Sequence, residues 1–194
     1  MRLAPLLLLT LALPGTLSAQ VGSETPSRDR ISATASLFFK AGKIADENRL
    51  HVGGWAGLVF GDRLAVGGGG FTVVNDVELP GSAGGTGFDL DVGYGGLFLR
   101  YWEPLTPSLL GEAGLILGAG HAEVQDQLTR SEVGSDNFLM AEAEMSLLYS
   151  LLPGVAMGAS VGYRMTSGVE DIPGVSVGEL NTFTGTLFLR LGGE

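Results

Sequence analysis

Apolar and polar residues alternate along most of this chain, in segments separated by turn-forming residues. Eight segments have this pattern and are predicted to be β-strands: Ile31–Lys40, Leu50–Phe60, Leu64–Val74, Phe88–Tyr101, Leu109–His121, Phe138–Leu151, Val155–Met165 and Leu180–Leu191. Their lengths lie between 10 and 14 residues. Soluble strands usually run about 5–6 residues, whereas a tilted strand that crosses a membrane needs about 9–11. The lengths therefore favour membrane-spanning strands.

The connections between these segments alternate in length. The even connections are short: Gly61–Arg63, Trp102–Ser108 and Leu152–Gly154. The odd connections are long and polar: Ala41–Arg49, Asn75–Gly87, Ala122–Asn137 and Thr166–Glu179. Long loops on one end and short turns on the other are typical of transmembrane barrels. The pattern predicts an all-β fold, an eight-stranded antiparallel up-and-down transmembrane β-barrel.

The distribution of charge indicates which medium surrounds the barrel. The eight segments hold nine of the chain's charged residues, whereas Lys, Arg, Asp and Glu together number 32, being 11 basic plus 21 acidic. A soluble, lipocalin-like barrel would need a charged outer face, so lipid outside and a small polar interior fit better. A helical membrane protein is the other alternative, because Met145–Tyr163 carries no charge. Pro153 and Gly154 interrupt that run at its centre and disfavour a helix.

Composition removes several further classes of protein. Glycine occupies 32 of 194 positions, which disfavours helices, and the apolar fraction of 45% disfavours disorder. The chain has no cysteine, which excludes disulfides, thiolate metal sites and a lipid-modified cysteine. A net charge of −10 is a poor match for nucleic acid, whose phosphates require Lys and Arg.

The first residues have the layout of a secretory signal peptide. Arg2 supplies a positive charge, Leu3–Leu13 is apolar, and the run ends near the small residue Ala19. We expect residues 1–19 to be the signal peptide, residues 20–30 a periplasmic extension and residues 31–194 the barrel.

Charged residues inside the predicted strands are expected to form a polar network in the lumen. The residues assigned to it are Glu112, Glu142, Glu144, Arg164, Arg190, Asp89 and Asp91. Charges without water must be paired, so the first interpretation is structural. The alternative is a path or gate for protons or ions, because clustered carboxylates can share a proton.

Aromatic residues near the strand ends predict two interfacial belts, where amphipathic rings meet lipid headgroups. Those assigned to the short-turn end are Phe60, Tyr101, Trp102 and Tyr149, and those assigned to the long-loop end are Phe138 and Phe183.

Candidate chemistry is sparse. The two histidines, His51 and His121, are expected to be exposed at the rim, and neither stands in a pattern that pairs it with a nucleophile. We predict no catalytic residue, no metal site and no cofactor. The acidic segments Ala122–Asn137 and Thr166–Glu179 are expected to be solvated, with binding of divalent cations or basic surfaces as the alternative.

The last predicted strand carries a family resemblance. Gly185–Leu191 resembles the closing strand of small outer-membrane barrels of the OmpX, OmpW and OmpA transmembrane-domain type. The resemblance implies a bacterial outer membrane of the Gram-negative type, periplasmic termini and outward-facing loops. It also implies outer-membrane lipid, lipopolysaccharide and the barrel-assembly machinery as partners, and we expect a monomer. The expected function is a non-enzymatic structural or surface-interaction role. The alternatives are a narrow pore for small or hydrophobic solutes and a lipid-modifying enzyme.

Overall fold

Nine β-strands make up the regular structure of the computed structural model, which describes residues 31–44, 47–74, 78–79, 88–126, 131–168 and 181–193. The strands are β1 (Ile31–Ile44), β2 (Glu47–Phe60), β3 (Leu64–Val73), β4 (Glu78–Leu79), β5 (Phe88–Thr106), β6 (Leu109–Asp126), β7 (Glu132–Leu152), β8 (Val155–Ser167) and β9 (Thr182–Gly192). Among the described residues, no helix is long and apolar enough to span a bilayer. The predicted signal peptide and periplasmic extension lie outside the described residues.

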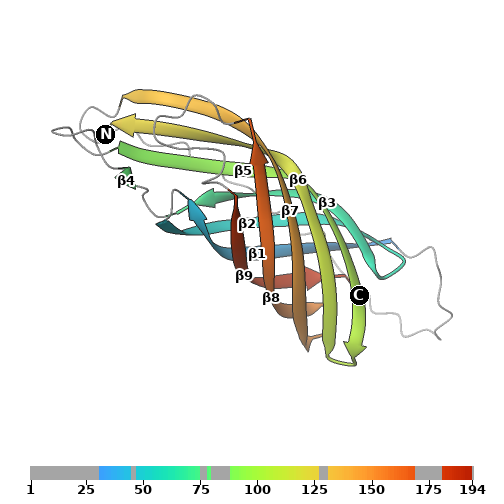
Figure 1. The fold of residues 1–194 in the computed structure, drawn as a ribbon. Helices are drawn as coiled ribbons and strands as arrows, with labels where there is room; N and C mark the ends of the chain where they lie inside the picture. Colours follow the sequence, from blue (N-terminus) through green and yellow to red (C-terminus); the bar gives the residue numbers. More distant parts are fainter. Residues whose placement is uncertain are drawn as a thin grey trace, which may run out of the picture.

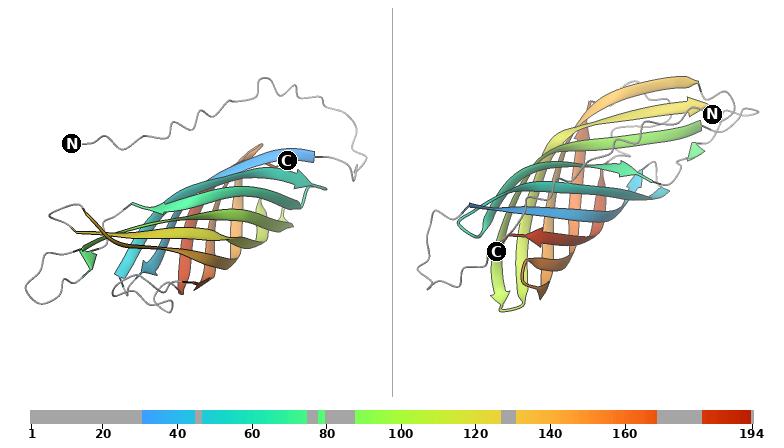
Figure 2. Two further views of the ribbon diagram at one scale, coloured as in Figure 1. Left: turned by 90° about the horizontal axis from the view of Figure 1, so that it is seen from above. Right: turned by 180° about the vertical axis from the view of Figure 1, so that it is seen from behind.

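Eight long antiparallel strands form a closed ring (Figures 1 and 2). Each pairs with its neighbour along the chain, β1 pairs with β9, and β3 pairs directly with β5. The two-residue strand β4 pairs only with the start of β5. Closure leaves no sheet edge within the barrel wall. The predicted eight-stranded up-and-down barrel is confirmed.

The three connections predicted to be short are short in the structure, but two of their boundaries are wrong, because residues 102–106 belong to β5 and Leu152 belongs to β7. Strands β2 and β3 are joined by residues 61–63, β5 and β6 by 107–108, and β7 and β8 by 153–154. Tight turns need left-handed backbone, and Gly61, Asp62 and Gly154 supply it with φ values of 58°, 61° and 71°.

Two connections predicted to be long are shorter in the structure. Pairing of β1 with β2 continues to Ile44↔Glu47, and pairing of β6 with β7 continues to Gln125↔Glu132. The boundaries predicted at Ala41–Arg49 and Ala122–Asn137 are therefore wrong. Polar residues were assigned to loops, but a strand that extends beyond the apolar belt is solvated and can be polar on both faces.

Three strands are much longer than the others. β5, β6 and β7 have 19, 18 and 21 residues, against 13 in β8 and 11 in β9. The pairing of β7 with β8 ends at Leu139↔Ser167, so residues 132–138 pair only with β6 among the described residues. The far ends of the three strands thus form a sheet that projects past the ring (Figure 1, upper left). We call residues 88–92, 120–126 and 132–138 the projecting sheet.

Burial alternates along the strands of the ring, most regularly in β8 and β9. In β8, for example, every second residue from Ala156 to Thr166 is buried, and the residues between them are exposed. The exposed set is apolar and includes Leu37, Met145, Val161, Phe183 and Leu187, with 61–79% of each residue exposed. The buried set mixes rings, threonines and charges. The barrel therefore has an apolar outside and a polar and aromatic inside, as the charge distribution predicted.

Glycines allow adjacent strands to approach closely where the wall curves. A Cβ on Gly69 in β3 would collide with the Gly54 carbonyl and with Trp55 of the paired strand β2. A Cβ on Gly118 in β6 would likewise collide with the Gly95 carbonyl of β5. Only glycine tolerates such contacts, so these positions explain part of the high glycine content.

Candidate functional site in the barrel interior

Three glutamates on neighbouring strands bring negative charge into the barrel. Glu112 lies on β6 and Glu142 and Glu144 lie on β7, each at an inward position of the alternating pattern, and each is at most 4% exposed. The pairing of β6 with β7 sets Glu144 opposite Gly114, next to Glu112 on the same face. The structure therefore places all three carboxylates in the barrel interior.

Cations from three other strands join these carboxylates into one alternating chain. Lys40 Nζ donates to Glu142 Oε1 at 2.8 Å and lies 2.8 Å from Glu144 Oε1. Arg100 donates through Nη2 to Glu144 and through Nη1 to Glu112, both at 2.7 Å. The second oxygen of Glu112 accepts a hydrogen bond from Arg190. We call the resulting six residues, Glu142, Lys40, Glu144, Arg100, Glu112 and Arg190, the charge chain.

Aromatic rings pack against the cations of the charge chain. Lys40 Nζ lies 4.2 Å from the centroid of Phe71, and Arg100 Cζ lies 5.2 Å from Phe38. Arg190 Cζ lies 4.9 Å from the centroid of Trp102. Cation–π contacts of this kind gain strength where water is excluded. Each cation of the chain is thus held between a carboxylate and a ring.

The rings also pack against one another across the lumen. Phe38 lies 5.5 Å from Phe71 and 5.4 Å from Phe188, and Trp55 stacks on Phe98 at 5.8 Å, all between ring centroids. All five are at most 5% exposed. The interior at this level is filled with side chains.

Arg164 does not join the charge chain, although we had assigned it to the same network. It is buried and stands directly opposite Glu142 in the β7–β8 register. Its Nε and Nη2 nevertheless make no hydrogen bond, and its guanidinium lies 5.0 Å from the ring of Tyr94. Glu142 is instead engaged by Lys40 and by the Thr184 hydroxyl, which donates to it at 2.6 Å.

The direction of the side chains on β5 decides the outcome for two predicted members of the network and for one member that was not predicted. Asp91 is exposed, so its assignment to the lumen is wrong, and the Asp89 side chain lies outside the described part of the structure. Residues of even number on β5 point inward, among them Tyr94, Phe98 and Arg100. Arg100 and Lys40, both central to the charge chain, were missed. The charge on Arg100 could have indicated the inward face of β5, because an arginine within a membrane-spanning strand has to face the interior.

Four of the six residues assigned to the aromatic belts face outward, and the assignment is wrong for the other two. Phe60, Tyr101, Tyr149 and Phe183 point outward with 40–79% exposure. Trp102 and Phe138 are 4% and 3% exposed and belong to the interior. Adjacent residues on a strand face opposite sides, so Tyr101 and Trp102 cannot both belong to the belt.

The histidines differ from each other in burial. His51 was expected at the exposed rim, but it is fully buried and its ring lies 5.6 Å from Tyr94. His121 is exposed, as expected, and its Nδ1 lies 3.1 Å from Asn137 Oδ1. Within the described residues, no three His, Asp or Glu side chains gather as a metal site would require.

The outer face also carries a polar cluster at the short-turn end. Arg63, in the turn after β2, donates to Glu103 Oε2 at 2.5 Å, and the Tyr101 hydroxyl donates to the same oxygen at 2.9 Å. The backbone carbonyl of Arg63 accepts the N–H of Trp102 at 3.0 Å, which fixes the turn beside β5. The neighbouring Tyr101 hydroxyl and the charge of Glu103 raise the pKa of Arg63, so Arg63 remains cationic.

Several solved structures of outer-membrane proteins are similar to this barrel. The fold is similar to that of Neisserial surface protein A (TM-score 0.61, 14% identity, covering 84% of this chain and 96% of that one). It is also similar to the N-terminal β-barrel domain of Pseudomonas aeruginosa OprF (TM-score 0.53, 16% identity, 82% and 96% coverage). A third similar structure is Ail of Yersinia pestis, solved with the heparin analogue sucrose octasulfate (TM-score 0.50, 15% identity, 84% and 97% coverage).

No protein-family profile and no curated protein sequence matches this chain. The similarity to the solved structures, at these levels of identity, defines the fold: a small eight-stranded barrel of the outer-membrane type.

Proposed function

We propose that this protein is an integral outer-membrane barrel with a non-enzymatic role, in which a solid barrel anchors a surface-exposed sheet that binds other molecules. The observation that carries the proposal is the contrast between a filled interior and a sheet that projects beyond the ring. The apolar outer face supports insertion in a bilayer, and the N-terminal leader expected from the sequence supports export.

The filled interior favours an anchor over a pore. A conducting barrel needs a continuous water path, whereas rings and ion pairs occupy the middle of this one. Phe38, Phe98, Arg100 and Leu148 are at most 1% exposed. Eight strands enclose a space that side chains can fill, and here they do.

The interior also gives no support to an enzymatic role. Acyl transfer or hydrolysis needs a nucleophile within hydrogen-bond reach of its base. His51 makes no hydrogen bond through either ring nitrogen, and the hydrogen bond of His121 is to an amide oxygen.

The projecting sheet is suited to a basic partner. Its strand ends contain Asp89, Asp91, Glu123, Asp126, Glu132 and Asp136, and no Lys or Arg. Negative potential on a protruding surface attracts positively charged molecules and accelerates their association. We therefore propose a cationic protein or peptide surface as the partner.

Two experiments test this proposal. Outer-membrane fractionation, with gel mobility compared before and after boiling, should find a heat-shifted protein in the outer membrane; a periplasmic protein without a shift would contradict it. Binding of a lysine-rich peptide to the protein in lipid vesicles should weaken steeply between low and high salt. It should also weaken in the triple variant Asp91→Asn, Glu123→Gln, Asp136→Asn, and equal binding by the variant would refute the assignment to the projecting sheet.

A further inference from the structure

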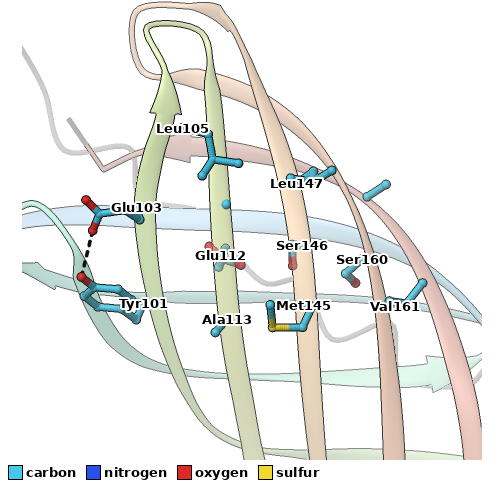
Figure 3. Close-up of a pocket in the computed structure, with 12 residues that line it drawn as sticks. Tyr101, Glu103, Leu105, Glu112, Ala113, Met145, Ser146, Leu147, Ser160 and Val161 are labelled. Carbon is cyan, nitrogen blue, oxygen red and sulfur yellow. Dashed lines mark hydrogen bonds between the residues drawn. The ribbon is translucent and has the colours of Figure 1, made fainter.

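The lipid-facing wall has a groove near the short-turn end of the barrel. It has a volume of about 610 Å³ and crosses β5, β6, β7 and β8 (Figure 3). Two small residues of β6, Gly111 and Ala113, form its floor, and Ala159 and Val161 of β8 line it beyond β7. A volume in this range is typical of sites that hold a small molecule, about 300–1,000 Å³.

Larger apolar side chains form the sides of the groove. Met145 and Leu147 of β7 stand on one side of the β6 floor, and Leu105 of β5 stands on the other, where a bulge between Pro104 and Thr106 shifts the β5–β6 register. Leu105 leans over the floor, since a Cβ on Gly111 would lie 3.3 Å from its Cδ1. The groove is therefore a depression in the apolar outer face, formed where small residues of β6 lie between larger side chains of β5 and β7.

One side of the groove carries the polar cluster of Arg63, Tyr101 and Glu103. Tyr101 and Glu103 line the groove, and Glu103 connects it to Arg63. The side chains of Arg63 and Glu103 are 51% and 48% exposed. Within the described residues both hydrogen bonds reach Glu103 Oε2, and Oε1 accepts neither. A guanidinium has five N–H donors and Arg63 gives one nitrogen to Glu103, so the pair retains both donor and acceptor capacity.

The polar cluster must supply any selectivity of this site. An acyl chain that leaves the bilayer for the groove exchanges one apolar environment for another. The groove can therefore select lipids by the shape of their chains, but it cannot select them by their headgroups. The cluster presents a cation and an anion in direct contact. Its chemical complement is a zwitterion that carries a phosphate for Arg63 and an ammonium with N–H donors for Glu103.

We propose that this groove holds one acyl chain of a phospholipid with a phosphoethanolamine headgroup, its phosphate on Arg63 and its ammonium on Glu103. The inference rests on the proposed function, because it requires the short-turn end to lie at the headgroup level of a bilayer. A quaternary choline headgroup lacks N–H donors, and a glycerol headgroup lacks the positive charge. Both should bind less well than phosphoethanolamine.

Native mass spectrometry of the full protein, released from a membrane of equal phosphatidylethanolamine, phosphatidylcholine and phosphatidylglycerol with identical chains, tests the proposal. We expect one bound lipid, with phosphatidylethanolamine retained at least five-fold over the other two. Glu103→Gln should remove the preference over phosphatidylcholine. Ala113→Leu should fill the floor and abolish retention of all three lipids, whereas Ala33→Leu, an outward position on β1, should retain it.

Three outcomes would overturn the proposal: equal retention of the three lipids, retention unaffected by Ala113→Leu, or a second copy of the chain in place of lipid. Circular dichroism and the heat-dependent gel shift show whether each variant is folded and inserted. A wild-type protein that fails to insert would refute the proposed function, whereas an inserted barrel without lipid selectivity would refute this inference alone.

Discussion

Different types of side chain line the two sides of the barrel interior. The acidic wall, β6 and β7, contributes the carboxylates of Glu112, Glu142 and Glu144. The aromatic wall, β1 to β3 with β5, contributes Phe38, Trp55, Phe71 and Phe98 and contains the densest run of glycines, at positions 67–70. Lys40, Arg100 and Arg190 lie between the carboxylates and the rings.

The comparison shows why neither wall would be stable alone. Carboxylates out of water need cations, and long cationic side chains need apolar surface for their stems. A glycine in the acidic wall leaves space for the Arg100 side chain, because a Cβ on Gly114 of β6 would lie 3.3 Å from Arg100 Nη1. The acidic wall thus depends on hydrogen-bond geometry, and the aromatic wall depends on close backbone approach.

The largest effect should come from removing the central cation. Arg100→Met leaves Glu112 and Glu144 each short of one buried partner, and we expect the free energy of unfolding to fall by about 3–5 kcal/mol. Urea unfolding in lipid vesicles measures this change. Arg63→Met, which removes a half-exposed ion pair, is the control and should have a far smaller effect. Equal effects of the two variants would contradict the charge chain.

The aromatic wall should respond to a single methyl group. Gly69→Ala forces a Cβ against Gly54 and Trp55, and we expect it to cost about 1–3 kcal/mol of unfolding free energy. Gly68→Ala, one residue earlier, meets only the Gly96 carbonyl at 3.6 Å and should be tolerated. The same urea titration compares them. If Gly68→Ala proves the more damaging variant, the close approach of β2 and β3 is not what constrains this wall.

Arg164→Met should have the smallest effect of the buried cation variants. The sequence alone predicted destabilisation, because Arg164 was assigned to the network. In the structure Arg164 has unmade hydrogen bonds and no ion pair within the described residues, so replacing it with a similarly sized apolar residue should leave stability unchanged or raise it. A loss comparable to that of Arg100→Met would show that Arg164 pairs with a carboxylate after all.

The inward position of Trp102 can be tested without a change in stability. Trp55 and Trp102 are both buried in the interior, so lipids brominated on their acyl chains should quench little of the protein's tryptophan fluorescence. Introducing an outward tryptophan with Tyr101→Trp should add a strongly quenched component. Strong quenching of the wild type would place a tryptophan in the belt, as the sequence had suggested.

The sequence was sufficient to predict the barrel and insufficient to predict its interior chemistry. Strand number and short turns follow from local alternation and turn residues, which depend on near neighbours. Local alternation does not determine the inward face of β5. Asp91 and Arg100 lie on opposite faces of this strand, and only the packing of the whole barrel decides which face is inside. Asp91 lies on the projecting sheet, where water is available, so its charge does not identify the lumen. The charge chain joins residues far apart in the sequence, such as Lys40 and Glu142, which are 102 positions apart, and no local pattern encodes that contact.

Single-channel recording in a planar bilayer tests the filled interior most directly. The wild-type protein, shown to be inserted by its heat-dependent gel shift, should give no reproducible openings. The double variant Trp55→Ala, Phe98→Ala, which removes two stacked rings from the aromatic wall, serves as the positive control and should conduct. Openings of uniform size in the wild-type protein would contradict a barrel closed by its own side chains.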